Sequence, residues 1–181
     1  MRQKTKKIAS TSWGSVAQWY DETVESEGSY QQDLILPNLL RLMEIKKGER
    51  VLDLACGQGL FTRAFAAAGA KAVAADISKE LVAIAKQKSP KNIAYHVASA
   101  HSLPFLKDDS VDKVAVVLAL QNIENMNETL AECARVLTPR GKLYLVLNHP
   151  AFRIPKESSW GFSEKEGVQY RRIDRYISEL H

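Results

Sequence analysis

Short apolar runs alternate with longer amphipathic stretches through the first 150 residues of the chain. The runs are typical of strands and cover 51–54, 72–75, 93–97, 111–118 and 142–147. Apolar positions three and four residues apart predict helices over 34–43, 61–68, 81–88 and 130–137. Because the run 72–75 is apolar without interruption, its strand should be covered on both faces. The pattern therefore predicts an α/β fold with a mainly parallel sheet of about five strands between helices.

The first run leads directly into a loop of small residues, Ala55-Cys56-Gly57-Gln58-Gly59, and a helix follows at once. Glycine lets the backbone approach a ligand that a Cβ atom would repel, and the first N–H groups of a helix have no partner within it. A strand, a glycine loop and a helix in this order predict a nucleotide-type site. The dinucleotide fingerprint needs a third glycine where this chain has Thr62, which argues against a nicotinamide cofactor.

An acid ends the second run: Asp76 follows Asp53 by 23 residues. Nucleotide-binding βαβ units place a carboxylate at about this distance, where it accepts hydrogen bonds from both ribose hydroxyls. Asp76 has a second interpretation as an acid at the start of the next helix, beside Ser78. Its place directly after a strand favours ribose binding.

Four motifs, in this order, resemble those of class I S-adenosylmethionine-dependent methyltransferases. They are the acid and small-x-Gly-x-Gly loop at 53–59, the acid Asp76, the segment 98–105 ending in leucine-proline-phenylalanine, and the turn at 135–141. The resemblance covers about residues 15–150. It implies a Rossmann-like three-layer sandwich, S-adenosyl-L-methionine as cofactor and S-adenosyl-L-homocysteine as product.

The resemblance also assigns a part of the cofactor to each motif. The glycine loop approaches the amino-acid end, with Asp53 fixing the ammonium directly or through water, while Asp76 holds the ribose and Ile77 covers the adenine. The full set of cofactor-binding residues implied in this way is Asp53, Ala55, Cys56, Gly57, Gln58, Gly59, Asp76, Ile77, Ser99, Ala100, His101 and Leu118.

Two of these positions depart from the pattern of the family. Ala55 stands where glycine is most common, and an alanine there costs little as long as its φ stays negative. Ser99 stands where the family has an acid that meets the adenine amino group. A serine hydroxyl still accepts one hydrogen bond, so we expect a weaker contact there, supplemented by backbone groups at Ala100 and His101. His101 is equally compatible with an exposed loop position.

Two residues are candidates for a catalytic role. Tyr20 belongs to the segment 17–21, which resembles the family's "ala-x-x-tyr-asp" lid over the cofactor, although anchoring a helix in the core explains it equally well. His149 follows the last predicted strand and is the histidine best placed for a general base, but a structural role at the strand end is somewhat favoured. The two cysteines show no metal-ligand spacing, so we expect no metal.

The composition points to a globular protein in a reducing compartment. With 181 residues and 45% hydrophobic residues, one domain with its own core is expected. The net charge of +4 comes largely from clusters near the two ends, which solvated segments explain better than nucleic-acid binding. No apolar run approaches the roughly 20 residues of a membrane span. The cytoplasm is the expected compartment.

We divide the chain into a flexible basic tail (1–12), a cofactor-binding core (13–150) and a substrate-side segment (151–181) with a helix over 170–180. The family has seven strands and this sequence shows about five. We therefore expect the final hairpin to be absent and this chain to be a shortened or unusual member of the family. The strand at 142–147 would then be an unpaired edge. We therefore expect a homodimer through this edge.

The sequence as a whole predicts methyl transfer to a small-molecule acceptor. A sulfonium methyl group is electrophilic without help, so the protein mainly aligns donor and acceptor, and no strong acid–base constellation is needed. Two alternatives remain: a module that binds the cofactor without catalysis, and an NAD-dependent oxidoreductase.

Overall fold

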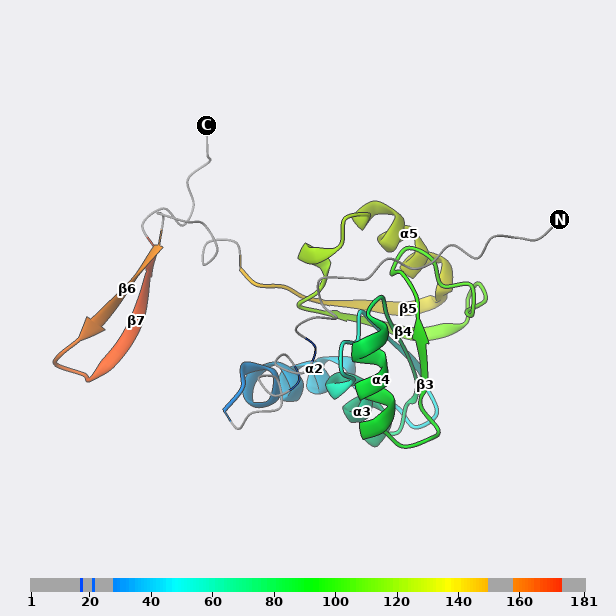
Figure 1. Cartoon of the computed structure of the whole chain (residues 1–181), viewed down its shortest axis with the longest axis horizontal. Helices are drawn as coiled ribbons and strands as arrows, with labels where there is room; N and C mark the ends of the chain where they lie inside the picture. Colours follow the sequence, from blue (N-terminus) through cyan, green and yellow to red (C-terminus); the bar gives the residue numbers. More distant parts are fainter. Residues whose placement is uncertain (1–16, 18–20, 22–27, 150–157, 174–181) are drawn as a thin grey trace. The chain divides into compact units, whose positions relative to one another are not determined.

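The structure is a computed structural model that describes residues 17, 21, 28–149 and 158–173. The chain divides into two compact units, Met1–Val146 and Leu147–His181 (Figure 1). Each unit is described by itself. The first contains the parallel sheet and its helices, and the second contains a hairpin.

Five parallel strands form the sheet of the first unit, in the order β3-β2-β1-β4-β5. Their bounds are β1 (Arg50–Leu54), β2 (Lys71–Asp76), β3 (Ala94–Val97), β4 (Val111–Val117) and β5 (Leu137–Val146). In chain order, β2 and β3 are added on one side of β1, and β4 and β5 are added on its other side. The strand order therefore reverses between β1 and β4, which is where open α/β sheets bind their ligands.

In the part of the chain that the structure describes, four α-helices cover the sheet: α2 (Leu36–Met43), α3 (Leu60–Ala67), α4 (Lys79–Lys88) and α5 (Met126–Val136). A π-helical turn (Gln31–Ile35) precedes α2, and a 3₁₀ turn (Leu120–Asn122) follows β4. Figure 1 shows α5 on one face and α2, α3 and α4 on the other. The predicted α/β class, a Rossmann-like three-layer sandwich with a mainly parallel sheet, is confirmed.

Successive side chains of β1 point to opposite faces of the sheet, so this one strand packs against the helices on both faces. Val51 packs with Leu39, Met43, Phe61 and Phe65 of α2 and α3. Its neighbour Leu52 points to the other face and packs with Cys133 and Val136 of α5. Since successive side chains of a strand point to opposite faces, a continuous apolar run is needed when both faces are covered.

The turn expected over 135–141 is built differently. Helix α5 ends at Val136 and β5 begins at Leu137 without a loop. The register then shifts, because Leu137 pairs with Val111 and Lys142 with Lys113, so four residues of β5 lie opposite one of β4. The residues predicted as a turn thus form a bulge at the start of an edge strand.

The described residues of the second unit include an antiparallel hairpin, β6 (Ser158–Ser163) and β7 (Val168–Ile173). The helix expected over 170–180 is wrong for Tyr170–Ile173, which belongs to β7, and the remaining residues lie outside the described part. Trp160 and Phe162 lie two residues apart in β6, the spacing that places two side chains on one face of a strand. Within the described residues β6 and β7 pair only with each other, and β5 is an edge of the large sheet.

Candidate functional site

The carboxyl ends of β1, β2 and β4 and the loop after β3 bring most of the predicted residues together. Two adjoining cavities, of about 100 and 380 Å³, open there. Both are lined by Ala55, Asp76, Ile77, Asn122 and Ile123. The smaller is further lined by Gly57 and Leu118, and the larger by Ser99, Ala100 and His101. The two cavities thus follow the sheet edge on both sides of Asp76.

Asp76 connects the glycine loop to the start of α4. Its Oδ2 accepts a hydrogen bond from the N–H of Gly57 at 2.8 Å, and its Oδ1 accepts one from the N–H of Ser78 at 2.8 Å. Burial raises the pKa of the Asp76 carboxyl, while these backbone N–H groups oppose the rise. Asp76 therefore organises the helix start, as one of the two sequence-based interpretations expected, and it also lines both cavities.

Asp53 lies deeper than Asp76 and is not among the residues that line the two cavities. Its Oδ2 accepts a hydrogen bond from the hydroxyl of Thr62 at 2.5 Å, and the residue is 2% exposed. Burial, assisted by the nearby charge of Asp76, raises the pKa of Asp53 to about 7. Thr62 occupies the position of the third glycine in a dinucleotide fingerprint. In this chain the side chain at that position donates a hydrogen bond to Asp53.

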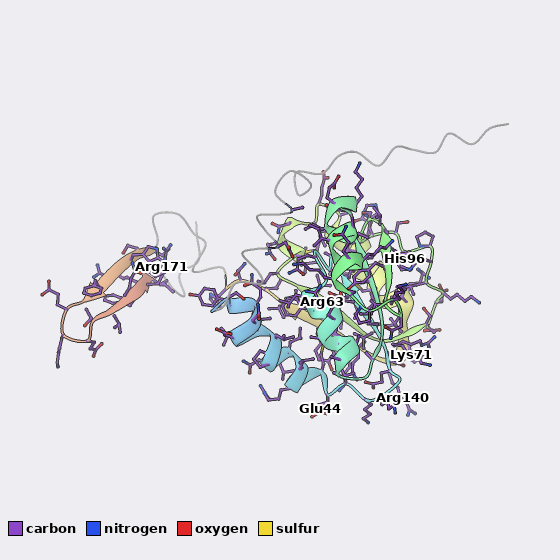
Figure 2. The ribbon with its side chains drawn as sticks, turned by 60° about the horizontal axis from the view of Figure 1, so that its bottom comes forward. Glu44, Arg63, Lys71, His96, Arg140 and Arg171 are labelled. Atoms are coloured by element: carbon purple, nitrogen blue, oxygen red, sulfur yellow. The ribbon has the colours of Figure 1, made fainter. Side chains whose placement is uncertain are left out.

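The middle of the glycine loop contains a buried donor without an acceptor. Gln58 is 2% exposed, and its Oε1 accepts a hydrogen bond from the N–H of Leu60 at 2.6 Å. That bond fixes the orientation of the side-chain amide, and its Nε2 has no partner among the described residues. Arg63 of α3, labelled in Figure 2, donates to the Gln58 carbonyl at 2.8 Å. A buried amide nitrogen of this kind requires an acceptor.

Gly59 cannot be replaced without strain, because its φ is +84° and a Cβ atom there would lie 2.5 Å from the Tyr95 hydroxyl. Tyr95 comes from β3 and packs beneath the loop, where its hydroxyl is 2.8 Å from Oγ of Ser89. The loop is therefore shaped from below by a strand that sequence analysis did not connect with it. In the sequence, the glycine at position 59 was the signal that another part of the chain comes close to the loop there.

Two non-glycine residues of the smaller cavity adopt left-handed backbone. Ala55 has φ +59° and Leu118 has φ +52°, at the carboxyl ends of the neighbouring strands β1 and β4. The condition that Ala55 keeps a negative φ is therefore not met, and the alanine adopts the conformation for which the family uses glycine. Left-handed backbone costs a non-glycine residue about 1–2 kcal/mol. Strain of this kind concentrates at ligand sites.

A polar cluster lines the larger cavity after β3. Oγ of Ser99 lies 2.8 Å from Nδ1 of His101, and Nδ2 of Asn125 lies 3.4 Å from the same nitrogen. His101 is exposed and at the same time lines the cavity, so it fits both of the roles considered for it. The position that carries an acid in the family is thus occupied by a hydroxyl and an imidazole.

A charged clamp, not foreseen from the sequence, holds the loop that follows this cluster. Arg135 of α5 donates from Nε and Nη2 to the two carboxylate oxygens of Glu132, at 2.8 and 2.7 Å, and lowers the pKa of that carboxyl. It also donates to the carbonyls of Leu103 and Leu106, at 3.3 and 3.1 Å. The N–H of Leu103 donates to Glu132 at 2.7 Å. The leucine-proline-phenylalanine motif and the arginine of 135–141 therefore form one unit.

Cys56 lines neither cavity, and this geometry does not test the two catalytic candidates. Cys56 is buried, and burial raises the pKa of its thiol well above the usual value, so it packs as a small apolar residue. Tyr20 lies outside the described residues. His149 belongs to the second unit. The catalytic roles of Tyr20 and His149 stay predictions.

The N-terminal segment 17–21 is described only at its ends, where Ala17 and Asp21 are helical. Ala17 is 5% exposed, and Asp21 forms an ion pair with Lys88 of α4 at 2.7 Å. Within the ranges that the structure describes, no three His, Cys, Asp or Glu side chains gather as a metal site. In those same ranges no helix has the length and apolarity to cross a membrane.

Comparisons with known proteins agree with this geometry. Residues 52–145 match the methyltransferase domain family. The chain is 38% identical over 106 residues to a demethylmenaquinone methyltransferase of Renibacterium salmoninarum, covering 58% of this chain and 44% of that protein. It is 36% identical over 101 residues to a ubiquinone biosynthesis O-methyltransferase of Xanthomonas oryzae, covering 54% and 42%. The chain thus spans less than half the length of both relatives.

Among solved structures, an S-adenosylmethionine-dependent methyltransferase of Mesorhizobium loti is similar, with a TM-score of 0.63 and 30% sequence identity over 77% of this chain and 64% of that chain. The fold is that of an S-adenosylmethionine-dependent methyltransferase. The chain belongs to the methyltransferase domain family, whose cofactor is S-adenosylmethionine.

The residues present fit this cofactor. The buried Nε2 of Gln58 has no acceptor among the described residues, and a carboxylate group would supply one. Asp76 faces the cavities with a carboxylate whose two backbone bonds leave further lone pairs for hydroxyl groups.

Proposed function

We propose that this chain transfers the methyl group of S-adenosylmethionine to a small-molecule acceptor. The observation that carries the proposal is the position of Asp76, which joins the glycine loop and lines both cavities at the point where strand order reverses. An acid, a glycine loop and a helix start at one sheet edge suit an adenosine joined to an amino acid.

The cofactor residues divide by position along the sheet edge. Gln58 receives the amino-acid carboxylate on its unpaired amide nitrogen, and Asp53 balances the ammonium from below the loop. Asp76 binds the ribose hydroxyls. Ile77, which is 41% exposed, covers one face of the adenine, and the pair Ser99 and His101 meets its edge.

When bound, the cofactor supplies a methyl group on a sulfonium, which is electrophilic without assistance. The residues of this chain hold the donor at a fixed place, leave a line of approach beside it and keep water away. The apolar wall of the smaller cavity, formed by Leu81, Val117, Leu118, Ala119 and Ile123, suits that task. Tyr20 and His149 are the proposed groups for orienting an acceptor or taking its proton.

An apolar, ring-bearing acceptor is the substrate class we favour. The relatives act on demethylmenaquinone or in ubiquinone biosynthesis, according to their names. The wall beside Leu118 carries no charged side chain apart from Asp76, which is assigned to the cofactor. An apolar wall of this kind is better matched by an aromatic acceptor than by a highly charged one.

Calorimetric titration of the chain with S-adenosylhomocysteine tests the proposal, with NADH as the competing ligand. We expect micromolar binding of the first ligand and none of NADH. Asp76→Ala should weaken binding at least tenfold, whereas Asp33→Ala, which removes an exposed carboxylate far from the cavities, should not. Absence of S-adenosylhomocysteine binding to the folded chain would contradict the proposal, and binding without turnover on a panel of quinol and phenol acceptors would favour the cofactor-binding module.

We also propose that two copies pair through the outer edge of β5. Among the described residues no strand pairs with that edge, and Leu143–Val146 line an apolar cavity of about 430 Å³ with α2. Open edges of this kind favour strand addition. Light scattering should show a dimer at high protein concentration.

The two free, buried cysteines agree with a reducing compartment, and we propose the cytoplasm.

A further inference from the structure

A further cavity lies at the opposite edge of the sheet from the predicted cofactor residues. It measures about 570 Å³ and is formed at the amino ends of β1, β2 and β4, the residues before β3 and the loop 105–107. Its lining residues are Arg50, Ala66, Ala70, Lys71, Ala72, Val73, Asn92, Ile93, Phe105, Leu106, Lys107, Ser110 and Val111. None of them lines either cofactor cavity.

The lining has an apolar floor and a cationic rim. Alanine, valine, isoleucine, leucine and phenylalanine side chains supply the floor, and Phe105 is held in place by stacking on His96 with ring centroids 3.7 Å apart. Arg50, Lys71 and Lys107 supply three positive charges, and no lining residue is acidic. Figure 2 labels Lys71 at this end of the sheet.

Three acidic residues close in sequence to the rim residues have partners of their own, namely Glu49, Asp108 and Asp112. Asp112 accepts the backbone N–H of Arg50 at 2.8 Å and lines a neighbouring cavity together with Glu49, which pairs with Lys113. Asp108 pairs with Arg135 at 2.6 Å. The side chains of Arg50, Lys71 and Lys107 make no hydrogen bond or ion pair with any residue that the structure describes. Three free cations around an apolar cavity leave a local excess of positive charge.

We propose that this cavity is a second ligand site, which binds a small organic anion with an apolar body, such as an aromatic or aliphatic carboxylate, sulfonate or phosphate. Sites for small molecules typically measure roughly 300–1,000 Å³ and combine mostly apolar walls with a few polar groups. The cationic rim selects an anion by charge complementarity. It also disfavours the chain's own basic start, with Arg2, Lys4, Lys6 and Lys7, as the occupant.

A matched pair of fluorescent probes tests the site. 1-Anilinonaphthalene-8-sulfonate is an apolar anion, and N-phenyl-1-naphthylamine has the same ring system without the charge. We expect saturable binding of the anion that is at least tenfold weaker in Lys71→Gln/Lys107→Gln, with binding of the neutral probe unchanged. The control Lys142→Gln/Lys165→Gln removes two exposed charges outside the cavity and should bind the anion as the wild type does.

The place where the anion binds, and its independence of S-adenosylhomocysteine, are measured in the same protein. Nitrogen–proton correlation spectra should show shifts at 70–73, 92–93 and 105–107 on adding the anion, and excess S-adenosylhomocysteine should not displace it. Equal affinity of the anion for wild type and Lys71→Gln/Lys107→Gln would overturn the proposal, as would shifts confined to 55–59 and 76–77. Since the wild type and both variants keep the cofactor residues, their titration with S-adenosylhomocysteine reports separately on the proposed function.

Discussion

Asp76 Oδ2 accepts a hydrogen bond from the backbone N–H of Gly57 at 2.8 Å, so the acid after β2 holds the glycine loop after β1. The same carboxylate accepts the N–H of Ser78 through Oδ1. Two strands and one helix start therefore depend on a single side chain. Asp76 acts on the cofactor cavities in two ways, by its own charge and by fixing the loop.

Asp76→Ala should destabilise the fold as well as weaken cofactor binding. It leaves two buried N–H groups without acceptors, at a cost of about 1–3 kcal/mol each. Asp76→Asn should be nearly as harmful, because its amide nitrogen would face one of these donors. Urea unfolding of both variants measures the effect. Wild-type stability in Asp76→Asn would show that one acceptor is enough.

Ala55→Gly should stabilise the protein. The backbone of Ala55 has φ +59°, which glycine adopts without steric cost, so we expect a gain of about 0.5–1 kcal/mol. Ala64→Gly in α3 is the matched control, and there the same substitution should cost about 1 kcal/mol because the residue is helical. Thermal unfolding of the two variants compares them directly, and opposite signs are the expected result. A loss in both variants would contradict strain at Ala55.

Asp53 should make stability depend on pH. Its pKa of about 7 in the folded chain lies above the ordinary value of 3.8, so the folded state favours the protonated form. This contribution is fully present below about pH 4 and is lost as the pH rises through 7. Asp53→Asn retains an acceptor for Thr62 but cannot ionise. Relative to the variant, the wild type should therefore lose stability between pH 5 and pH 8.

Urea unfolding at those two pH values measures this difference. Asp76, whose pKa is also raised, contributes in the same direction in both proteins, so the variant should retain part of the dependence. Asp33→Asn, at an exposed position, serves as the control and should follow the wild type. Parallel pH profiles of wild type and Asp53→Asn would show that the carboxyl of Asp53 titrates normally.

Arg135→Lys should loosen the loop that carries Ser99 and His101. A lysine keeps the charge but cannot form the paired bonds to Glu132 or reach both loop carbonyls. We expect a loss of about 1–3 kcal/mol and severalfold weaker S-adenosylhomocysteine binding. Arg140→Lys, at an exposed position of β5, should change stability by less than about 0.5 kcal/mol. Calorimetry and unfolding on both variants decide whether the clamp positions the adenine side.

The sequence by itself determined the layers and the cofactor loop. The continuous apolar run 72–75 predicted a strand covered on both faces, and 53–59 with Asp76 predicted a ligand site at one edge of the sheet. These features are local, because a strand, a glycine turn and a helix start are encoded by neighbouring residues. The order of the motifs along the chain was enough to match them to those of the methyltransferase family.

Only the tertiary structure decided how those motifs hold one another. The φ of Ala55, the bond from Thr62 to Asp53, the packing of Tyr95 under Gly59 and the clamp of Arg135 on Leu103 join parts of the chain that the sequence does not order in space. The hairpin Ser158–Ile173 was missed because aromatic and basic residues in mixed order fit a helix or a ribbon. Backbone angles and long-range partners are set by packing, which no local pattern records.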